Sequence, residues 1–215
     1  MKIGINRLHY PVTALGPGRR IGIWVQGCSI GCAGCASTDT WAAVPERLVE
    51  VAEVIDRCAA ILDRGEAVDG VTISGGEPFQ QPEALAELLD SLDAWRSDRA
   101  PDIDLLCYSG LPWAKLQLHH AGLLARLDAV ITEPFIEGMP TDASWRGSAN
   151  QRLIPLSEKG EQRYRKADRS PPRMQVAVEN GEIWFIGVPR RGDLDRILEA
   201  GRRRGIEAKG PSWRS

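Results

Sequence analysis

The 215-residue sequence predicts an α/β fold, either a partial (βα)6-type barrel or an open parallel sheet, with a small C-terminal β-hairpin and helix. Apolar runs alternate with amphipathic helical stretches through the first two thirds of the chain, which favours parallel strands joined by right-handed crossovers. Beyond Ser170 the pattern changes to two strand-like runs around Asn180-Gly181, the strongest two-residue signal for a hairpin turn. We therefore expect a core domain at 1–160 and an extension at 161–215.

The expected strands of the core are short and apolar, and the expected helices carry a leucine-rich stripe at helical spacing. In chain order the strands lie at 21–25, 71–73, 103–108 and 128–132, and 151–155 could supply another. Helices are expected from about 45 to 62, from 82 through the stripe that ends at 95, and over 112–127. Strands at 174–179 and 182–186 form the expected hairpin, and a short basic helix follows at 192–204.

Composition is that of an ordinary globular protein, with 43% hydrophobic and 26% charged residues. Residues 1–10 lack the apolar segment of a secretory signal, and no apolar run approaches the roughly 20 residues of a membrane helix, so we expect a cytoplasmic protein with no membrane partner. Residues 161–215 carry 13 Lys or Arg and 8 Asp or Glu, a balance of +5 on an otherwise acidic chain. Without interleaved aromatic residues, nucleic acid is not the expected partner of this basic segment.

Three of the five cysteines lie in one short loop, spaced Cys28-x3-Cys32-x2-Cys35, directly after the first expected strand. A [4Fe–4S] cluster ordinarily takes four thiolates, so three would leave one iron open to a substrate or cofactor. Zinc with Cys58 or Cys107 as a distant fourth ligand, a structural cluster, and plain loop cysteines are the alternatives. The odd number of cysteines argues against a disulfide framework.

Unusual residues also follow each of the other expected core strands. Ser74-Gly-Gly-Glu-Pro78 comes after the second strand, Tyr108–Gly110 ends the third, and Thr132–Phe135 ends the fourth. The carboxyl ends of parallel strands share one edge of a sheet, where α/β active sites are assembled. We therefore expect these segments and the cysteine loop to converge, although the Gly-Gly segment alone is more typical of a tight turn than of a functional site.

Together, the cysteine spacing and the Gly-Gly-Glu-Pro segment resemble the radical S-adenosylmethionine (SAM) superfamily. Within it, the chain looks most like the anaerobic ribonucleotide reductase activating enzymes, a group of glycyl-radical activases. The other segments that carry the resemblance are Gly16–Gly18 with Arg20, Trp24–Trp41, Asp128–Phe135 and Arg146–Arg152. It spans roughly residues 10–156, and the activases usually stop near where residues 161–215 begin here.

The resemblance implies a [4Fe–4S] cluster on Cys28, Cys32 and Cys35, with the fourth iron binding the amino and carboxylate groups of SAM. One electron, supplied by a donor such as flavodoxin or ferredoxin, would cleave SAM to methionine and a 5′-deoxyadenosyl radical. In the activase group this radical takes a hydrogen atom from a backbone glycine of a glycyl-radical enzyme, the expected partner. A radical SAM enzyme that modifies a small molecule or ribosomal peptide, and a non-enzymatic metal-binding module, are the alternatives.

The resemblance also implies the residues of the SAM site. Gly75, Gly76 and Glu77 would receive the SAM amino group, and Pro78 stiffens the exit from this segment. The other positions implied in or near the site are Tyr108, Ser109, Thr132, Arg146 and Asn150. Thr132 departs from the family, whose members tend to carry Asp there, and Arg146 could instead pair with an acidic neighbour. No catalytic side chain is expected beyond the cluster and SAM.

Overall fold

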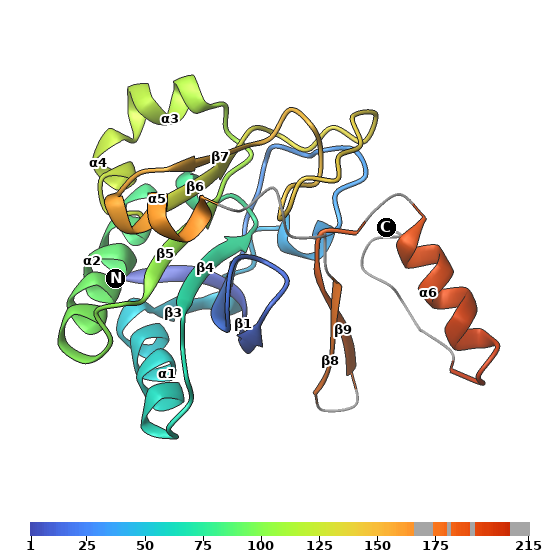
Figure 1. Ribbon diagram of the computed structural model, residues 1–215, viewed down its shortest axis with the longest axis horizontal. Helices are drawn as coiled ribbons and strands as arrows, with labels where there is room; N and C mark the ends of the chain where they lie inside the picture. The colour runs from blue at the N-terminus through green and yellow to red at the C-terminus, as the bar shows by residue number, and fades with distance from the viewer. Residues whose placement is uncertain (166–173, 180–181, 190–191, 207–215) are drawn as a thin grey trace.

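The computed structural model describes residues 1–165, 174–179, 182–189 and 192–206 (Figure 1). Its centre is a seven-stranded sheet in the order β3-β1-β2-β4-β5-β6-β7. The four middle strands are parallel, namely β2 (Arg20–Val25), β4 (Gly70–Gly75), β5 (Asp104–Tyr108) and β6 (Ala129–Thr132). This mostly parallel sheet confirms the predicted α/β class and all four predicted core strands.

Three antiparallel strands border the parallel centre. β1 (Lys2–Val12) pairs with β2, β3 (Leu48–Glu50) pairs with β1, and β7 (Arg152–Pro155) pairs with β6. Of these, only β7 was anticipated from the sequence. β1 was not predicted, because polar residues interrupt its apolar ones and most of its side chains beyond Ile5 are only half-buried.

Helices α1 (Val51–Asp63), α2 (Pro82–Arg99), α3 (Trp113–His119) and α4 (Ala121–Leu124) gather on one side of the sheet, at the left of Figure 1. The leucine stripe predicted for α2 is buried as expected. The predicted start of the first helix near Pro45 was wrong, because Pro45–Arg47 form a 3-10 turn and Leu48 enters β3 with 47% of its surface exposed. The single helix predicted over 112–127 is broken at His120, where the backbone φ of −133° is not helical.

A buried ion pair ties the parallel strands together at their amino ends, where β2, β4 and β5 begin. The Arg20 guanidinium donates to both carboxylate oxygens of Asp104, at 2.9 and 2.8 Å, and its Nε donates to Thr72 Oγ1 at 2.6 Å. The Tyr164 hydroxyl, on α5 (Glu158–Tyr164), donates to Asp104 Oδ2 at 2.6 Å. A buried pair is tolerable only when its hydrogen bonds are satisfied, as they are here, so this network fixes β2, β4, β5 and α5 relative to one another.

The C-terminal part forms the predicted hairpin and helix. β8 (Met174–Glu179) and β9 (Glu182–Gly187) make a separate two-stranded antiparallel sheet, followed by α6 (Asp193–Arg202), which lies at the far right of Figure 1. The Asn180-Gly181 turn predicted between the strands falls outside the described residues. The boundary at 160/161 stays a prediction, and α5 runs across it. In the described part of the chain, no helix has both the length and the apolarity that crossing a bilayer requires.

Candidate functional site

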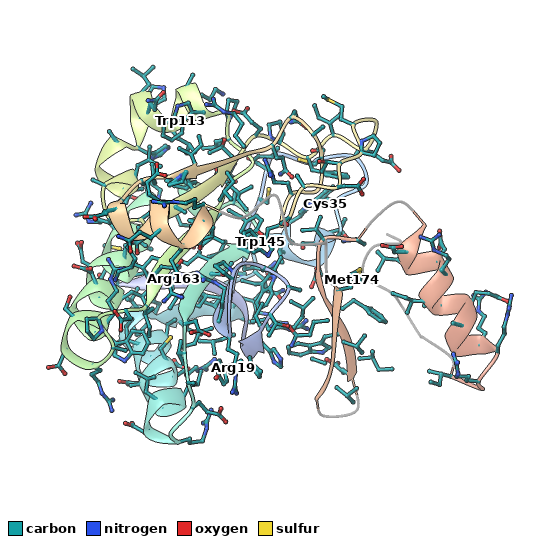
Figure 2. All side chains as sticks on the ribbon, in the orientation of Figure 1. Arg19, Cys35, Trp113, Trp145, Arg163 and Met174 are labelled. Carbon is teal, nitrogen blue, oxygen red and sulfur yellow. The ribbon has the colours of Figure 1, made fainter. Side chains whose placement is uncertain are left out.

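A cavity of about 270 Å³ lies at the carboxyl ends of the parallel strands. Its walls include Cys28, Cys32 and Cys35, together with the segments 74–77 and 108–110. Glu133 and Phe135, after β6, also line it. The structure therefore brings all four predicted strand-end segments to one cavity. Figure 2 shows Cys35 and Trp145, which both line this cavity, on the side of the sheet away from α1 and α2.

The two glycines of the Gly-Gly-Glu segment are required by the backbone that crosses them. Gly76 N–H donates to Val25 O and Glu77 N–H donates to Gly27 O, both at 2.9 Å, so the segment is bonded to the start of the cysteine loop. A Cβ on Gly76 would lie 2.3 Å from Gly27 O, and Gly75 has a φ of +100° that side chains disfavour. This close crossing holds the cysteine loop and Glu77 in a fixed relation.

The loop cysteines are half-buried thiols surrounded by backbone donors. The N–H groups of Ile30 and Gly31 hydrogen-bond the Cys28 thiol, and Ser37 N–H donates to Cys35 Sγ at 3.4 Å. Burial raises the pKa values of the Cys28 and Cys32 thiols above their ordinary range. Metal ligation requires thiolates, so loading this loop must release protons. Backbone donors at the sulfurs are among the features that tune an iron–sulfur cluster.

The other two cysteines do not join this group. Cys58 on α1 and Cys107 on β5 are buried in the hydrophobic core and do not line the cavity, and burial raises the Cys58 pKa to about 12. A zinc site with either one as a fourth ligand therefore has no support in the structure. Among the described residues, no three His, Cys, Asp or Glu side chains stand close enough to hold a single metal ion. The assignment of Cys28, Cys32 and Cys35 as ligands of an iron–sulfur cluster stays a prediction.

Glu77 is a fully buried carboxylate held in one orientation at the cavity wall. Its Oε1 accepts from Ser109 Oγ at 2.9 Å and from Phe79 N–H at 3.1 Å, and its Oε2 accepts from Gly110 N–H at 2.7 Å. Burial nevertheless raises the pKa of Glu77 to about 7, because the three donors offset only part of the lost hydration. A cationic group placed beside it would stabilise the ionised form, which makes the site suitable for an ammonium.

Tyr108 and Ser109, also predicted for the site, line the cavity and position other residues. The Tyr108 hydroxyl donates to Trp145 O at 3.0 Å, and burial raises its pKa well above the usual range, so it stays a neutral donor. The remaining predicted residues, Pro78, Thr132, Arg146 and Asn150, are not among the residues that form the cavity wall. The Thr132 hydroxyl and Asn150 Oδ1 are buried and unpaired, and the Asn150 amide donates to Pro134 O at 2.8 Å. Their roles stay predictions.

Known proteins are similar to this chain over a range that includes the cysteine loop and Glu77. Residues 14–154 match a protein family described as a 4Fe-4S single cluster domain. The chain belongs to this family. It is 30% identical over 138 residues to the anaerobic ribonucleoside-triphosphate reductase-activating protein of phage T4, covering 64% of this chain and 85% of the phage protein. The protein of the same name from Vibrio cholerae is 32% identical over 147 residues, covering 66% of this chain and 92% of its own. The resemblance to reductase-activating enzymes is thereby confirmed.

The solved structure of QueE from Escherichia coli overlaps part of the fold, with a TM-score of 0.40, 22% identity and coverage of 51% of this chain and 53% of its own.

The family match ends at residue 154, yet the cavity extends beyond that part of the chain. Residues 185–189, on and after β9, form another of its walls.

Several cavity residues were missed from the sequence. Glu133 and Trp145 both line the cavity with positive φ values, 82° and 62°, which side chains rarely adopt. Glu133 is held there because its carboxylate accepts from Trp113 N–H at 3.0 Å and its carbonyl accepts from Gln151 at 3.2 Å. Glu133 belongs to the predicted segment Thr132–Phe135, although it was not selected as a single site residue. The cavity residues that were not selected from the sequence also include Trp24, Trp145, Gly147, Gln151 and the hairpin segment.

Proposed function

We propose that the protein is a radical SAM enzyme that activates a glycyl-radical enzyme of the anaerobic ribonucleotide reductase type. One observation carries the proposal: the three thiols of the cysteine loop and the orientated carboxylate of Glu77 line the same cavity. The names of the relatives that share residues 14–154 support the choice of partner.

In this proposal Cys28, Cys32 and Cys35 hold the [4Fe–4S] cluster, while Glu77 accepts a hydrogen bond from the SAM ammonium. A cluster held there would supply the one-electron reduction that cleaves the C–S bond of SAM, with the electron coming from a flavodoxin- or ferredoxin-type donor, and the resulting 5′-deoxyadenosyl radical would take a hydrogen atom from a glycine Cα of the partner. Ser109 keeps Glu77 orientated, and the crossing at Gly76 fixes the distance from this carboxylate to the cysteine loop.

The proposal is tested by anaerobic reconstitution of the full chain with iron and sulfide. We expect about four irons per chain, SAM-dependent formation of 5′-deoxyadenosine with a strong reductant, and a glycyl radical signal when a candidate reductase is added. Cys32→Ala removes a cluster ligand, whereas Cys58→Ala removes a core thiol outside the cavity and is the matched control. Full iron content in Cys32→Ala, or a single bound zinc in the wild type, would overturn the assignment.

A second candidate is a radical SAM enzyme that acts on a small molecule or a ribosomal peptide. The observation that favours it is the hairpin wall at 185–189, which the family match does not include. Formation of 5′-deoxyadenosine without any partner-borne glycyl radical, across reductases from the same organism, would support this candidate over the first.

A further inference from the structure

The C-terminal hairpin supplies one wall of the cavity that holds the loop cysteines and Glu77. Residues 185–189, which include Phe185 and Val188, form this wall. The family match stops at residue 154, and the phage and Vibrio relatives align with only 64% and 66% of this chain although 85% and 92% of their own length is covered. This wall is therefore an addition to the part of the fold that the chain shares with its relatives.

Two polar contacts fix β8 to the end of β1. The side-chain amide of Gln175 donates to Pro11 O at 2.6 Å, and its Oε1 accepts from Thr13 N–H at 2.9 Å. The N–H and the oxygen of the Gln175 amide are thus paired with the backbone of Pro11 and Thr13, which lie 164 and 162 residues earlier in the chain. Such a pair of hydrogen bonds specifies where β8 sits, because sliding the hairpin would leave both groups unpaired.

The same face of the hairpin is also packed against β1. Trp184 lies across from Ala177 and on the same face as Gln175, and the Arg7 guanidinium carbon lies 3.0 Å from the centre of its ring. Cation–π contacts of this kind stabilise by roughly 0.5–2 kcal/mol. Ile186, only 4% exposed, packs with Val12 and Leu15. The hairpin is therefore seated on the core and is not a loosely tethered arm.

Beyond β9, the chain crosses to the opposite wall of the cavity. A Cβ built on Gly147 would lie 3.3 Å from Val188 Cγ1, so Val188 packs directly on the 145–151 loop. Figure 2 labels Trp145 of this loop and Met174 at the start of the hairpin, and Met174 pairs with Gly187 of the cavity wall. The hairpin segment thus bridges β1 and the 145–151 loop across the cavity.

We propose that the β8–β9 hairpin is a fixed wall of the SAM site, and that Phe185 and Val188 hold the nucleotide against the cluster and exclude water from it. This inference rests on the proposed function. At about 270 Å³ the cavity is slightly smaller than typical small-molecule sites of roughly 300–1,000 Å³, and the hairpin lines it with five consecutive residues, 185–189. Excluding water strengthens the electrostatic contacts within a site and protects reactive intermediates, and a pre-seated wall binds a ligand without being ordered first.

The test measures SAM binding and cluster survival in the full chain, reconstituted anaerobically with its cluster oxidised so that SAM is not cleaved. Phe185→Ala should weaken SAM binding by about ten-fold, since most of an apolar contact is removed, and should speed the loss of visible cluster absorbance in air. Val178→Ala is the matched control, because Val178 is on the same hairpin but is 70% exposed and does not line the cavity. Its SAM affinity and cluster lifetime should equal those of the wild type.

Two further variants separate the wall from general misfolding. Phe185→Leu keeps an apolar side chain there and should retain affinity within about three-fold. Gln175→Ala touches nothing in the cavity but releases the hairpin from β1, so it should weaken SAM binding in the same direction, less than additively with Phe185→Ala. If the wild type binds SAM and all hairpin variants bind it equally well, the wall is refuted and the proposed function stands. If the cluster-loaded wild type does not bind SAM, the proposed function itself fails.

Discussion

Glu77 should make the stability of the ligand-free protein depend on pH in a way that a glutamine at this position cannot. Its carboxylate is fully buried, and burial raises its pKa from 4.5 to about 7 despite hydrogen bonds from Ser109 and Gly110. The folded protein therefore binds this proton more tightly than the unfolded chain does. The resulting stability is fully present below about pH 4.5 and is lost progressively as the pH rises to about 7.

The magnitude follows from the difference between the two pKa values. At about 1.4 kcal/mol per pH unit, the change from 4.5 to about 7 corresponds to a loss of about 3 kcal/mol in the free energy of unfolding. That is a substantial fraction of the roughly 5–15 kcal/mol by which most domains are stable. Glu77→Gln has no proton to release, so this part of the pH dependence should be absent from the variant.

The assay is urea unfolding of the metal-free protein, kept anaerobic with its thiols reduced, at pH values from 5 to 8.5. Other groups titrate in both proteins, so the informative quantity is the difference between the unfolding free energies of the wild type and Glu77→Gln. We expect the wild type to lose about 2–3 kcal/mol relative to the variant over this range and the difference to level off above about pH 7. Parallel pH profiles would show that Glu77 is not a buried titrating group, and the argument for its poised carboxylate would fail.

Three further predictions concern binding and stability. SAM affinity of the cluster-loaded wild type, measured by calorimetry, should fall as the pH drops below about 7, because the ammonium needs an ionised Glu77; an affinity that is flat down to pH 5.5 would contradict this contact. Gly160→Ala should destabilise by more than about 2 kcal/mol in thermal or urea unfolding, since its Cβ would lie 1.9 Å from a backbone oxygen, whereas Gly138→Ala, with nothing within 4 Å, should change stability little. Tyr164→Phe should cost about 1–3 kcal/mol by removing the 2.6 Å hydrogen bond to buried Asp104, and unchanged stability would remove that network from the account of the fold.

The parallel half of the fold could be predicted from the sequence because its signals are local. The α2 stripe and the apolar runs of β2, β4, β5 and β6 each encode their burial within a few residues. β1 could not be found in this way, since its sequence mixes apolar and polar residues and most of its side chains beyond Ile5 are only half-buried. The start of α1 was misplaced for a similar reason: Leu48 fits a helical stripe, but pairing with β1 draws it into β3.

The residues of the candidate site also differ in whether local sequence signals or long-range contacts place them. The loop cysteines and Glu77 could be selected because their spacing and their place after strands are visible in the sequence. The glycines were expected to serve a ligand, and the structure adds a tertiary reason: a Cβ on Gly76 would lie only 2.3 Å from Gly27 O. The hairpin wall could not be anticipated, because it depends on contacts such as Gln175 with Thr13, 162 residues apart.

This division bears on how the chain differs from its relatives. The cysteine loop, Glu77 and their supporting hydrogen bonds lie within residues 14–154, so the cofactor chemistry we propose belongs to the shared core. The alignment with the Vibrio relative covers 92% of that protein. Little of its chain therefore remains to form a counterpart of the 185–189 wall. Phe185 and Val188 line the same cavity from outside that core. The hairpin wall is therefore the part of the cavity in which this chain can differ most from its relatives while the hydrogen bonds of Glu77 to Ser109 and Gly110 stay as they are.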